Sequence, residues 1–257
     1  MKAPPTLELP APYAKQHEAI CDPSRICIIE ASTKSGKTAG CLVWLLMQAW
    51  NQGLEGRAYW WVAPIYQQAK AIGYSRMKAM LMQADPEHRV WKAHESELWI
   101  ELWNGSKIWF KGADKSDSLY GEDVYAAVID EASRCREESW IAVRSTLTAT
   151  KGCIRIIGNV KGRRNWAYQL ARRAEGGEPD MAYHKLTAYD AIEGGVLDPE
   201  EVQQAKRILP DHVFKELYLA EPSDDGGNPF GIQAIQECIA PLSTQPATVF
   251  GVDLAKS

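Results

Sequence analysis

The segment RICIIEASTKSGKT, residues 25–38, decides the fold. Its first part, Arg25 to Glu30, is a short apolar run between two charges, which is typical of a strand buried on both faces of a sheet. The next eight residues, Ala31 to Thr38, match the Walker A pattern with alanine in place of its first glycine. A helix is expected from Ala39 to Gln52, so a strand precedes the loop and a helix follows it, as the motif requires.

This loop predicts a phosphate-binding site for ATP and Mg²⁺. Backbone N–H groups and the positive end of the helix dipole can face the phosphates. We expect Lys37 to neutralise the β- and γ-phosphates and the Thr38 hydroxyl to coordinate Mg²⁺. The alternative is a Gly-Lys-Thr helix start that arises by chance. The predicted nucleotide-binding residues of the loop are Ser32, Thr33, Lys34, Ser35, Gly36, Lys37 and Thr38.

Further apolar runs alternate with helical patterns along the chain, which predicts a mostly parallel α/β sheet flanked by helices. After the first strand we expect strands at Ala58–Ala63, Tyr125–Asp130 and Cys153–Gly158, and a helix at Tyr66–Met82.

One segment instead predicts an antiparallel hairpin at the sheet edge. The runs Leu98–Trp103 and Lys107–Lys111 flank Asn104-Gly105. This dipeptide favours a tight turn in which both central residues take positive φ.

A second motif follows some 90 residues after the loop, at Ala126–Glu131 (AAVIDE). It resembles a Walker B strand, with Asp130 at the carboxyl end, where ligands bind in open α/β sheets. Asp130 is expected to hold Mg²⁺ and Glu131 to accept a proton from the attacking water. An acidic N-cap for the next helix would give the same local sequence.

Two amides complete the predicted site. Asn159 ends a predicted strand, where it would sense the γ-phosphate as a catalytic residue or serve only as a turn residue. Gln16 precedes the first strand, and its amide can pair with adenine N6 and N7. The alternative for Gln16 is a solvated helix position.

Composition sets broad limits. The net charge is −4, which argues against a constitutive nucleic-acid binder. The six cysteines form no CxxC pair, so reduced thiols are expected rather than zinc ligands. Neither a bilayer-spanning apolar run nor a secretory signal is present, so we expect a cytosolic protein that is neither secreted nor in a membrane.

The charge is unevenly distributed. From Ser139 to Ala174 there is no acidic residue, so this segment predicts either a face for a polyanion or an ordinary solvated surface. Its basic residues are Arg144, Lys151, Arg155, Lys161, Arg163, Arg164, Arg172 and Arg173.

The chain changes character after residue 174. Glu175–Asp180 (EGGEPD) predicts a linker, followed by helices at Pro199–Leu209, with Asp198 as N-cap, and His212–Ala220. We therefore predict an ATPase core over 1–174, a small helical linker or lid subdomain over 175–246, and a further strand within 247–257.

The order of these pieces resembles the large terminase subunit of tailed bacteriophages, over nearly the whole chain. The resemblance rests on Tyr13–Gln16, Ser32–Thr38, Trp61–Lys70, the Asn104-Gly105 hairpin, Ser118–Gly121, Asp130–Ala132, Phe214–Pro222 and Thr248–Lys256.

This resemblance implies a P-loop NTPase of the RecA-like (ASCE) type, a motor that hydrolyses ATP and moves double-stranded DNA into a procapsid. It implies a portal protein and a small terminase subunit as partners, and a homo-oligomeric ring when the motor works, with a monomer in isolation left open. The location would be the host cytoplasm and, transiently, the procapsid portal.

The family also has an RNase H-like nuclease domain. Thr248–Asp253 resembles its first strand, and Asp253 its first metal ligand. Because a two-metal site needs several carboxylates from different elements, we expect no DNA cleavage by this sequence.

Two positions depart from the family pattern. Many relatives have a basic residue where Thr33 stands, and an arginine finger where Tyr120 stands. Arg134, Arg136, Arg144 or Lys115 could substitute for this finger, and the sequence does not distinguish among them.

Two rival functions stay open at this stage. A DEA-box-type helicase needs a second RecA-like domain, for which 175–257 is too short. A non-hydrolysing assembly module would not need Lys37, Thr38, Asp130 and Glu131 intact.

Overall fold

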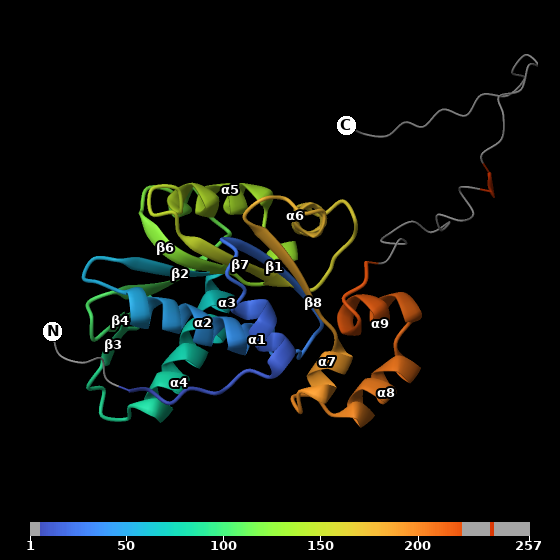
Figure 1. Ribbon diagram of the computed structural model, residues 1–257, viewed down its shortest axis with the longest axis horizontal. Helices are drawn as coiled ribbons and strands as arrows, with labels where there is room; N and C mark the ends of the chain where they lie inside the picture. Colours follow the sequence, from blue (N-terminus) through green and yellow to red (C-terminus); the bar gives the residue numbers. More distant parts are fainter. Residues whose placement is uncertain (1–5, 223–236, 239–257) are drawn as a thin grey trace, which may run out of the picture. The chain divides into compact units, whose positions relative to one another are not determined.

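A computed structural model of the chain describes residues 6–222 and 237–238. Its centre is an eight-stranded sheet with the order β3-β4-β5-β2-β6-β7-β1-β8 (Figure 1). The six neighbouring strands from β5 to β8 are parallel, and β4 is antiparallel to β3 and β5. The predicted α/β fold is confirmed. The strands are β1 (Ile26–Ala31), β2 (Ala58–Ala63), β3 (Trp91–His94), β4 (Trp99–Leu102), β5 (Lys107–Gly112), β6 (Val124–Ile129), β7 (Cys153–Gly158) and β8 (Met181–Leu186).

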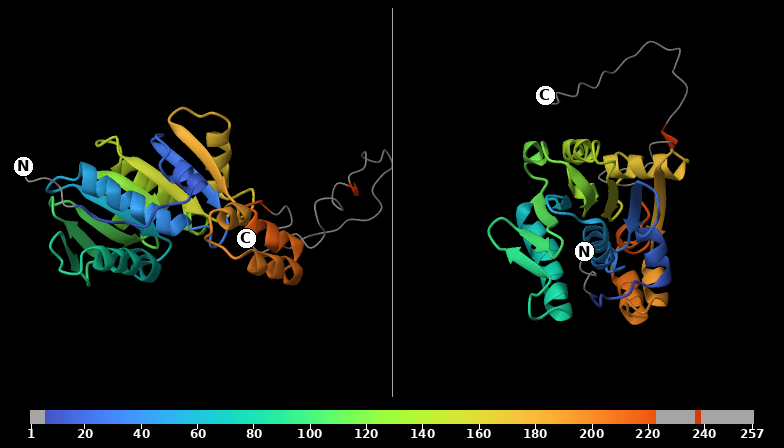
Figure 2. Two further views of the ribbon diagram at one scale, coloured as in Figure 1. Left: turned by 60° about the horizontal axis from the view of Figure 1, so that its bottom comes forward. Right: turned by 60° about the vertical axis from the view of Figure 1, so that its left-hand side comes forward.

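Helices cover both faces of this sheet, as the two views of Figure 2 show. One layer contains α1 (Ala14–Ile20), α2 (Lys37–Gln52) and α4 (Ser75–Ala84), and the other contains α5 (Glu137–Thr146) and α6 (Trp166–Glu175). Strand β1 shows why its sequence is apolar throughout. Cys27 and Ile29 pack into the core with α2, and Ile28 packs into the opposite core with α5 and α6.

The predicted helix Tyr66–Met82 exists, but it is interrupted. It consists of α3 (Tyr66–Gln68), a π-helical turn η1 (Ala69–Tyr74) and α4. The π-helical turn packs closely on the sheet at Gly73, where an added Cβ would lie 2.5 Å from Trp61 and 2.8 Å from Phe110. Sequence periodicity alone does not reveal such a widened turn, and the one residue in it with very low helix propensity is Gly73.

The predicted edge hairpin is confirmed as β4–β5, but the predicted turn type is wrong. The Gly105 N–H donates to the Leu102 carbonyl, and the Leu102 N–H donates to Ser106. Of the two central residues, Gly105 takes positive φ (78°) and Asn104 does not. The loop thus has three residues, with Gly105 forming the bulge. Strand β3, which had not been predicted, forms the outermost edge.

The sheet also continues past the predicted core boundary at residue 174. Strand β8 pairs in parallel with β1 from Met181 to Leu186, so the core includes it. The helices that follow are α7 (Ala188–Glu193), α8 (Pro199–Ile208) and α9 (Asp211–Tyr218), which share a small core of Ala188, Val202 and Phe214. Asp198 caps α8 as predicted, by accepting from the Glu200 N–H.

Two short 3₁₀ helices complete the elements used below, η2 (Ser116–Leu119) and η3 (Ala132–Arg134). The predicted strand within 247–257 lies outside the described residues. In the part of the chain that the structure describes, no helix has both the length and the apolar character needed to cross a membrane.

The close packing at Gly73 gives a first prediction. Gly73→Ala should lower the free energy of unfolding by about 1–3 kcal/mol, because the buried rings of Trp61 and Phe110 leave no room for a methyl group. Gly176→Ala is the control, since its nearest neighbours lie 3.4 Å away. Urea unfolding of both variants measures the difference, and equal stability would show that the helix can move outward freely.

Candidate nucleotide-binding site

Three adjacent parallel strands end at the same edge of the sheet, and the residues that follow them form the candidate site. Strand β1 leads into the loop at residues 31–38, β6 leads into Asp130 and Glu131, and β7 leads into Asn159. The order β6-β7-β1 explains why residues about a hundred positions apart in sequence meet. Parallel sheets characteristically bind ligands at this carboxyl edge.

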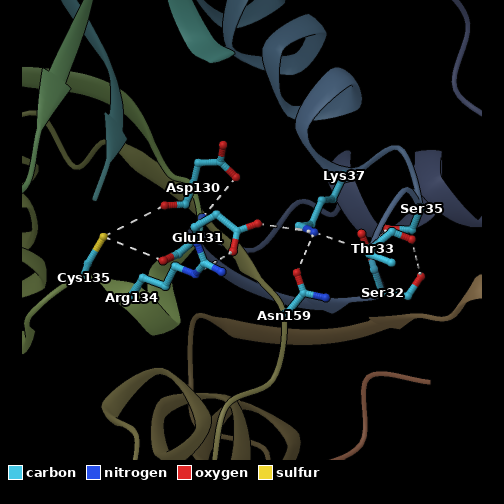
Figure 3. Close-up of polar contacts among 9 residues, drawn as sticks. All are labelled: Ser32, Thr33, Ser35, Lys37, Asp130, Glu131, Arg134, Cys135 and Asn159. Atoms are coloured by element: carbon cyan, nitrogen blue, oxygen red, sulfur yellow. Dashed lines mark hydrogen bonds and ion pairs between the residues drawn. The ribbon is translucent and has the colours of Figure 1, made fainter. Parts of the chain in front are cut away.

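The ammonium group of Lys37 lies at the centre of the site (Figure 3). Its Nζ donates to the Ser32 carbonyl at 3.3 Å and to Asn159 Oδ1 at 3.1 Å, and lies 3.5 Å from Glu131 Oε1. Lys37 is only 7% exposed. A buried cation must be paired and hydrogen-bonded, and these three acceptors from three elements meet that requirement.

The two acidic residues differ in environment. Asp130 is buried, and this burial together with the Glu131 carboxylate raises the pKa of Asp130 from 3.8 to about 7, against the attraction of Lys37. Its Oδ1 accepts from the Glu131 N–H at 3.1 Å. Glu131 takes a left-handed conformation with φ 50°, uncommon for a residue with a side chain and frequent at functional sites.

Some residues of the loop 31–38 hold its conformation rather than face the cavity. The side chains of Ser32 and Ser35 are buried, and the Ser35 hydroxyl donates to the Ser32 carbonyl at 2.9 Å. They therefore hold the loop's shape and would offer a ligand only their backbone. Thr33 donates its backbone N–H to the Leu217 carbonyl of α9 at 2.7 Å, which ties the loop to the C-terminal helices.

The amide of Gln16, predicted to pair with adenine, is bonded within the protein in this structure. Its Nε2 donates to the Gly36 carbonyl at 2.8 Å, its Oε1 accepts from the Tyr13 N–H at 3.2 Å, and the side chain is 5% exposed. Both ends of the amide are already bonded within the protein. Tyr13, which the sequence predicted only as part of the segment Tyr13–Gln16, donates from its hydroxyl to the Ser35 carbonyl at 3.0 Å. Gln16 and Tyr13 therefore buttress the loop.

A cavity of about 260 Å³ opens beside this cluster. The loop contributes Lys34, Lys37 and Thr38 to its wall, and β6 contributes Asp130 and Glu131 through the residues that follow it. Ile72 of η1 and Arg76 of α4 also line the cavity. Sequence reasoning missed Arg76 because nothing in the pattern distinguishes it from the other basic residues of this helix.

Thr38 and Asp130 border the same cavity, a donor set that suits Mg²⁺ delivered with a nucleotide, because Mg²⁺ commonly uses one or two protein ligands plus substrate phosphates. Among residues 6–222 and 237–238, no cluster of three or more His, Cys, Asp or Glu side chains forms a metal site by itself. Asp253 lies outside the described residues.

The basic segment Ser139–Ala174 does not form one continuous face. Arg155 is buried and donates to the carbonyl groups of Ile20 and Asp22. Arg172 forms an ion pair with Glu30, next to the loop. The exposed members are Lys151, Lys161, Arg163, Arg164 and Arg173. Of the finger candidates, Arg134 pairs with Glu131 of its own chain at 3.9 Å.

The chain is similar to a known protein family. A family model described as "Terminase large subunit, T4likevirus-type, N-terminal" matches residues 28–237. A search of curated proteins finds no match.

Several solved structures are similar to this chain. The large terminase ATPase domain of Thermus phage P74-26 has a TM-score of 0.70 at 21% identity, covering 82% of this chain and 94% of its own. The large terminase of another thermophilic bacteriophage, in complex with ADP, has a TM-score of 0.69 at 16% identity, covering 82% and 53%. The HK97 bacteriophage large terminase has a TM-score of 0.66 at 15% identity, covering 80% and 49%. This chain thus spans about half the length of the latter two.

The bonds of Gln16 give a second prediction. Gln16→Ala should lower the free energy of unfolding by about 1–3 kcal/mol, because the Gly36 carbonyl and the Tyr13 N–H lose their buried partner. The preference for ATP over GTP should stay unchanged. Urea unfolding and competition binding measure the two effects, with exposed Gln169→Ala as the control. Lost base preference at unchanged stability would instead support adenine pairing.

Proposed function

Because this chain belongs to the T4-like-virus-type family of terminase large subunits, we propose that it hydrolyses ATP and uses the energy to move double-stranded viral DNA. The observation that carries this proposal is the contact of Lys37 with Glu131 and Asn159, beside the cavity that Lys37 and Glu131 line. These residues are a phosphate-binding cation, a proton acceptor and a polar sensor, placed within reach of one another.

Hydrolysis would start with an exchange of partners at Lys37. The phosphates of ATP would take the ammonium group as their partner, helped by the loop N–H groups at the start of α2. Glu131, at present 3.5 Å from Lys37, would then be available to accept a proton from the attacking water. Mg²⁺, held by Thr38 and Asp130, would supply charge neutralisation on the phosphate oxygens.

Asn159 is suited to report the state of the terminal phosphate. Its Oδ1 accepts from Lys37, and its buried Nδ2 has no partner among the described residues. This free donor would bind a phosphate oxygen or the attacking water. Asn165 Nδ2, six residues on, donates to the Ser133 carbonyl at 2.9 Å, and Trp166 donates to Cys135 at 2.8 Å. Asn159 and Asn165 lie on the same connection between β7 and α6, so movement at Asn159 would reach α6 directly and η3 through these bonds.

The C-terminal helices would carry the motion away from the site. We propose that residues 175–246, apart from β8 in the core sheet, act as a linker or lid. The bond from Thr33 to Leu217 joins this part to the phosphate loop, and Lys15 forms an ion pair with Asp190 of α7 at 2.7 Å. We propose that residues 247–257 begin a nuclease domain.

The proposed partners follow from family membership. We propose contacts with double-stranded DNA through the exposed basic residues of the segment 139–174, and with a portal protein and a small terminase subunit, in a homo-oligomeric ring in the host cytoplasm. An arginine supplied by a neighbouring subunit, with Arg136 or Arg144 among the candidates, would then complete the site.

Substituting Glu131 tests the chemical step. Glu131→Gln should retain ATP binding within a few-fold and lower hydrolysis by about 10²-fold or more, because the amide cannot accept the proton. The exposed Glu137→Gln on α5 is the matched control. Phosphate release and equilibrium ATP binding are the measurements. Hydrolysis at the wild-type rate in Glu131→Gln would remove Glu131 from this role.

Adding DNA tests the motor function. Double-stranded DNA should increase phosphate release several-fold at low salt, and the increase should disappear at high salt because basic side chains make the contact. Stimulation by single strands together with strand separation would favour a helicase. Nucleotide binding without any hydrolysis would favour an assembly module.

A further inference from the structure

Arg76 occupies a distinctive position in the nucleotide cavity. The cavity has three cationic side chains, Lys34, Lys37 and Arg76. Lys37 is buried, and Lys34 is exposed. Arg76 comes from α4 rather than from the loop, so the cavity is lined by cations from two separate elements.

The fold holds the backbone of Arg76 firmly in place. Just before it, Gly73 packs against Trp61, and the ring of Tyr74 meets that of Phe110 edge-on at 5.5 Å. Just after it, Met77 is fully buried. The π-helical turn ends at Tyr74, which sets the direction in which α4 begins. The start of α4 is thus held in place by packing on both sides of Arg76, and the Arg76 side chain lines the cavity.

The guanidinium group of Arg76 lines this cavity without a carboxylate partner. Arg76 forms no ion pair with a carboxylate among the described residues. A guanidinium group has five N–H donors, which suit phosphate oxygens, and here they are not committed to a protein carboxylate.

The other nearby groups are less suited to this task. Thr33 carries no charge, and Arg134 pairs with Glu131. We propose that Arg76 binds the terminal phosphate of the nucleotide in its own subunit and stabilises the charge that develops there during hydrolysis. This inference rests on the proposed ATPase function. It gives the site an arginine in cis, in addition to Lys37 and Lys34.

Substitutions at Arg76 test the proposal. Arg76→Ala should lower phosphate release by about 10²-fold or more. It should also weaken binding of ATPγS much more than binding of ADP, because ADP lacks the terminal phosphate. Arg76→Lys should recover part of the phosphate release and part of the ATPγS binding, since lysine restores the positive charge but not the planar guanidinium group. Lys78→Ala is the control, because Lys78 lies on the same helix and pairs with Glu95.

Mixing two inactive variants tests whether Arg76 acts in its own subunit. Arg76→Ala and Lys37→Ala should stay inactive when mixed, since neither protein then has both cations in one site. Recovered hydrolysis in the mixture would overturn the cis assignment.

The outcomes separate this inference from the proposed function. A wild-type chain that binds neither ATPγS nor ADP would contradict the function itself. A hydrolysing wild type with Arg76→Ala equal to Lys78→Ala in turnover and in ATPγS binding would overturn the inference alone. Because Arg76 is exposed, thermal melting should match wild type and confirm that the variant is folded.

Discussion

The structure of the site depends on the burial of one ammonium group, that of Lys37. A buried cation is costly unless acceptors surround it, and no single element of this chain supplies enough of them. The loop gives the Ser32 carbonyl, the end of β6 gives Glu131, and the end of β7 gives Asn159. These acceptors meet only if β6, β7 and β1 are adjacent and parallel, so the sheet order and the chemistry of the site are two consequences of the same constraint.

Much of the fold could be predicted because buried parallel strands are apolar on both faces. The runs at β1, β2, β6 and β7 show this directly, since successive residues pack into opposite cores. Strands β3 and β8 were missed because they are edge strands and are largely half-buried, with polar residues such as Lys92 and His184. The hairpin was predicted correctly but its turn type was not, because Asn-Gly is compatible with both a two-residue loop and the three-residue loop observed.

For the site, the sequence identified the residues that follow the strands, namely Lys37, Thr38, Asp130, Glu131 and Asn159, because motif spacing fixes them to one edge. For Gln16, the residue type permits adenine pairing, and the structure adds bonds from its amide to the loop and to Tyr13 that the sequence did not predict. Sequence reasoning missed Arg76 for a different reason. Which side chain of a helix faces a cavity depends on the helix phase, and the π-helical turn η1 changes that phase without a clear sequence signal.

The central claim is that Lys37 and its acceptors form the ATP phosphate site, and an experimental structure with Mg²⁺ and ATPγS tests it most directly. The account predicts the terminal phosphate beside Lys37 Nζ, Mg²⁺ next to Thr38 and Asp130, and a Glu131 carboxylate that has moved away from Lys37. A nucleotide bound elsewhere, or one bound here with the contact between Lys37 and Glu131 unchanged at 3.5 Å, would contradict it.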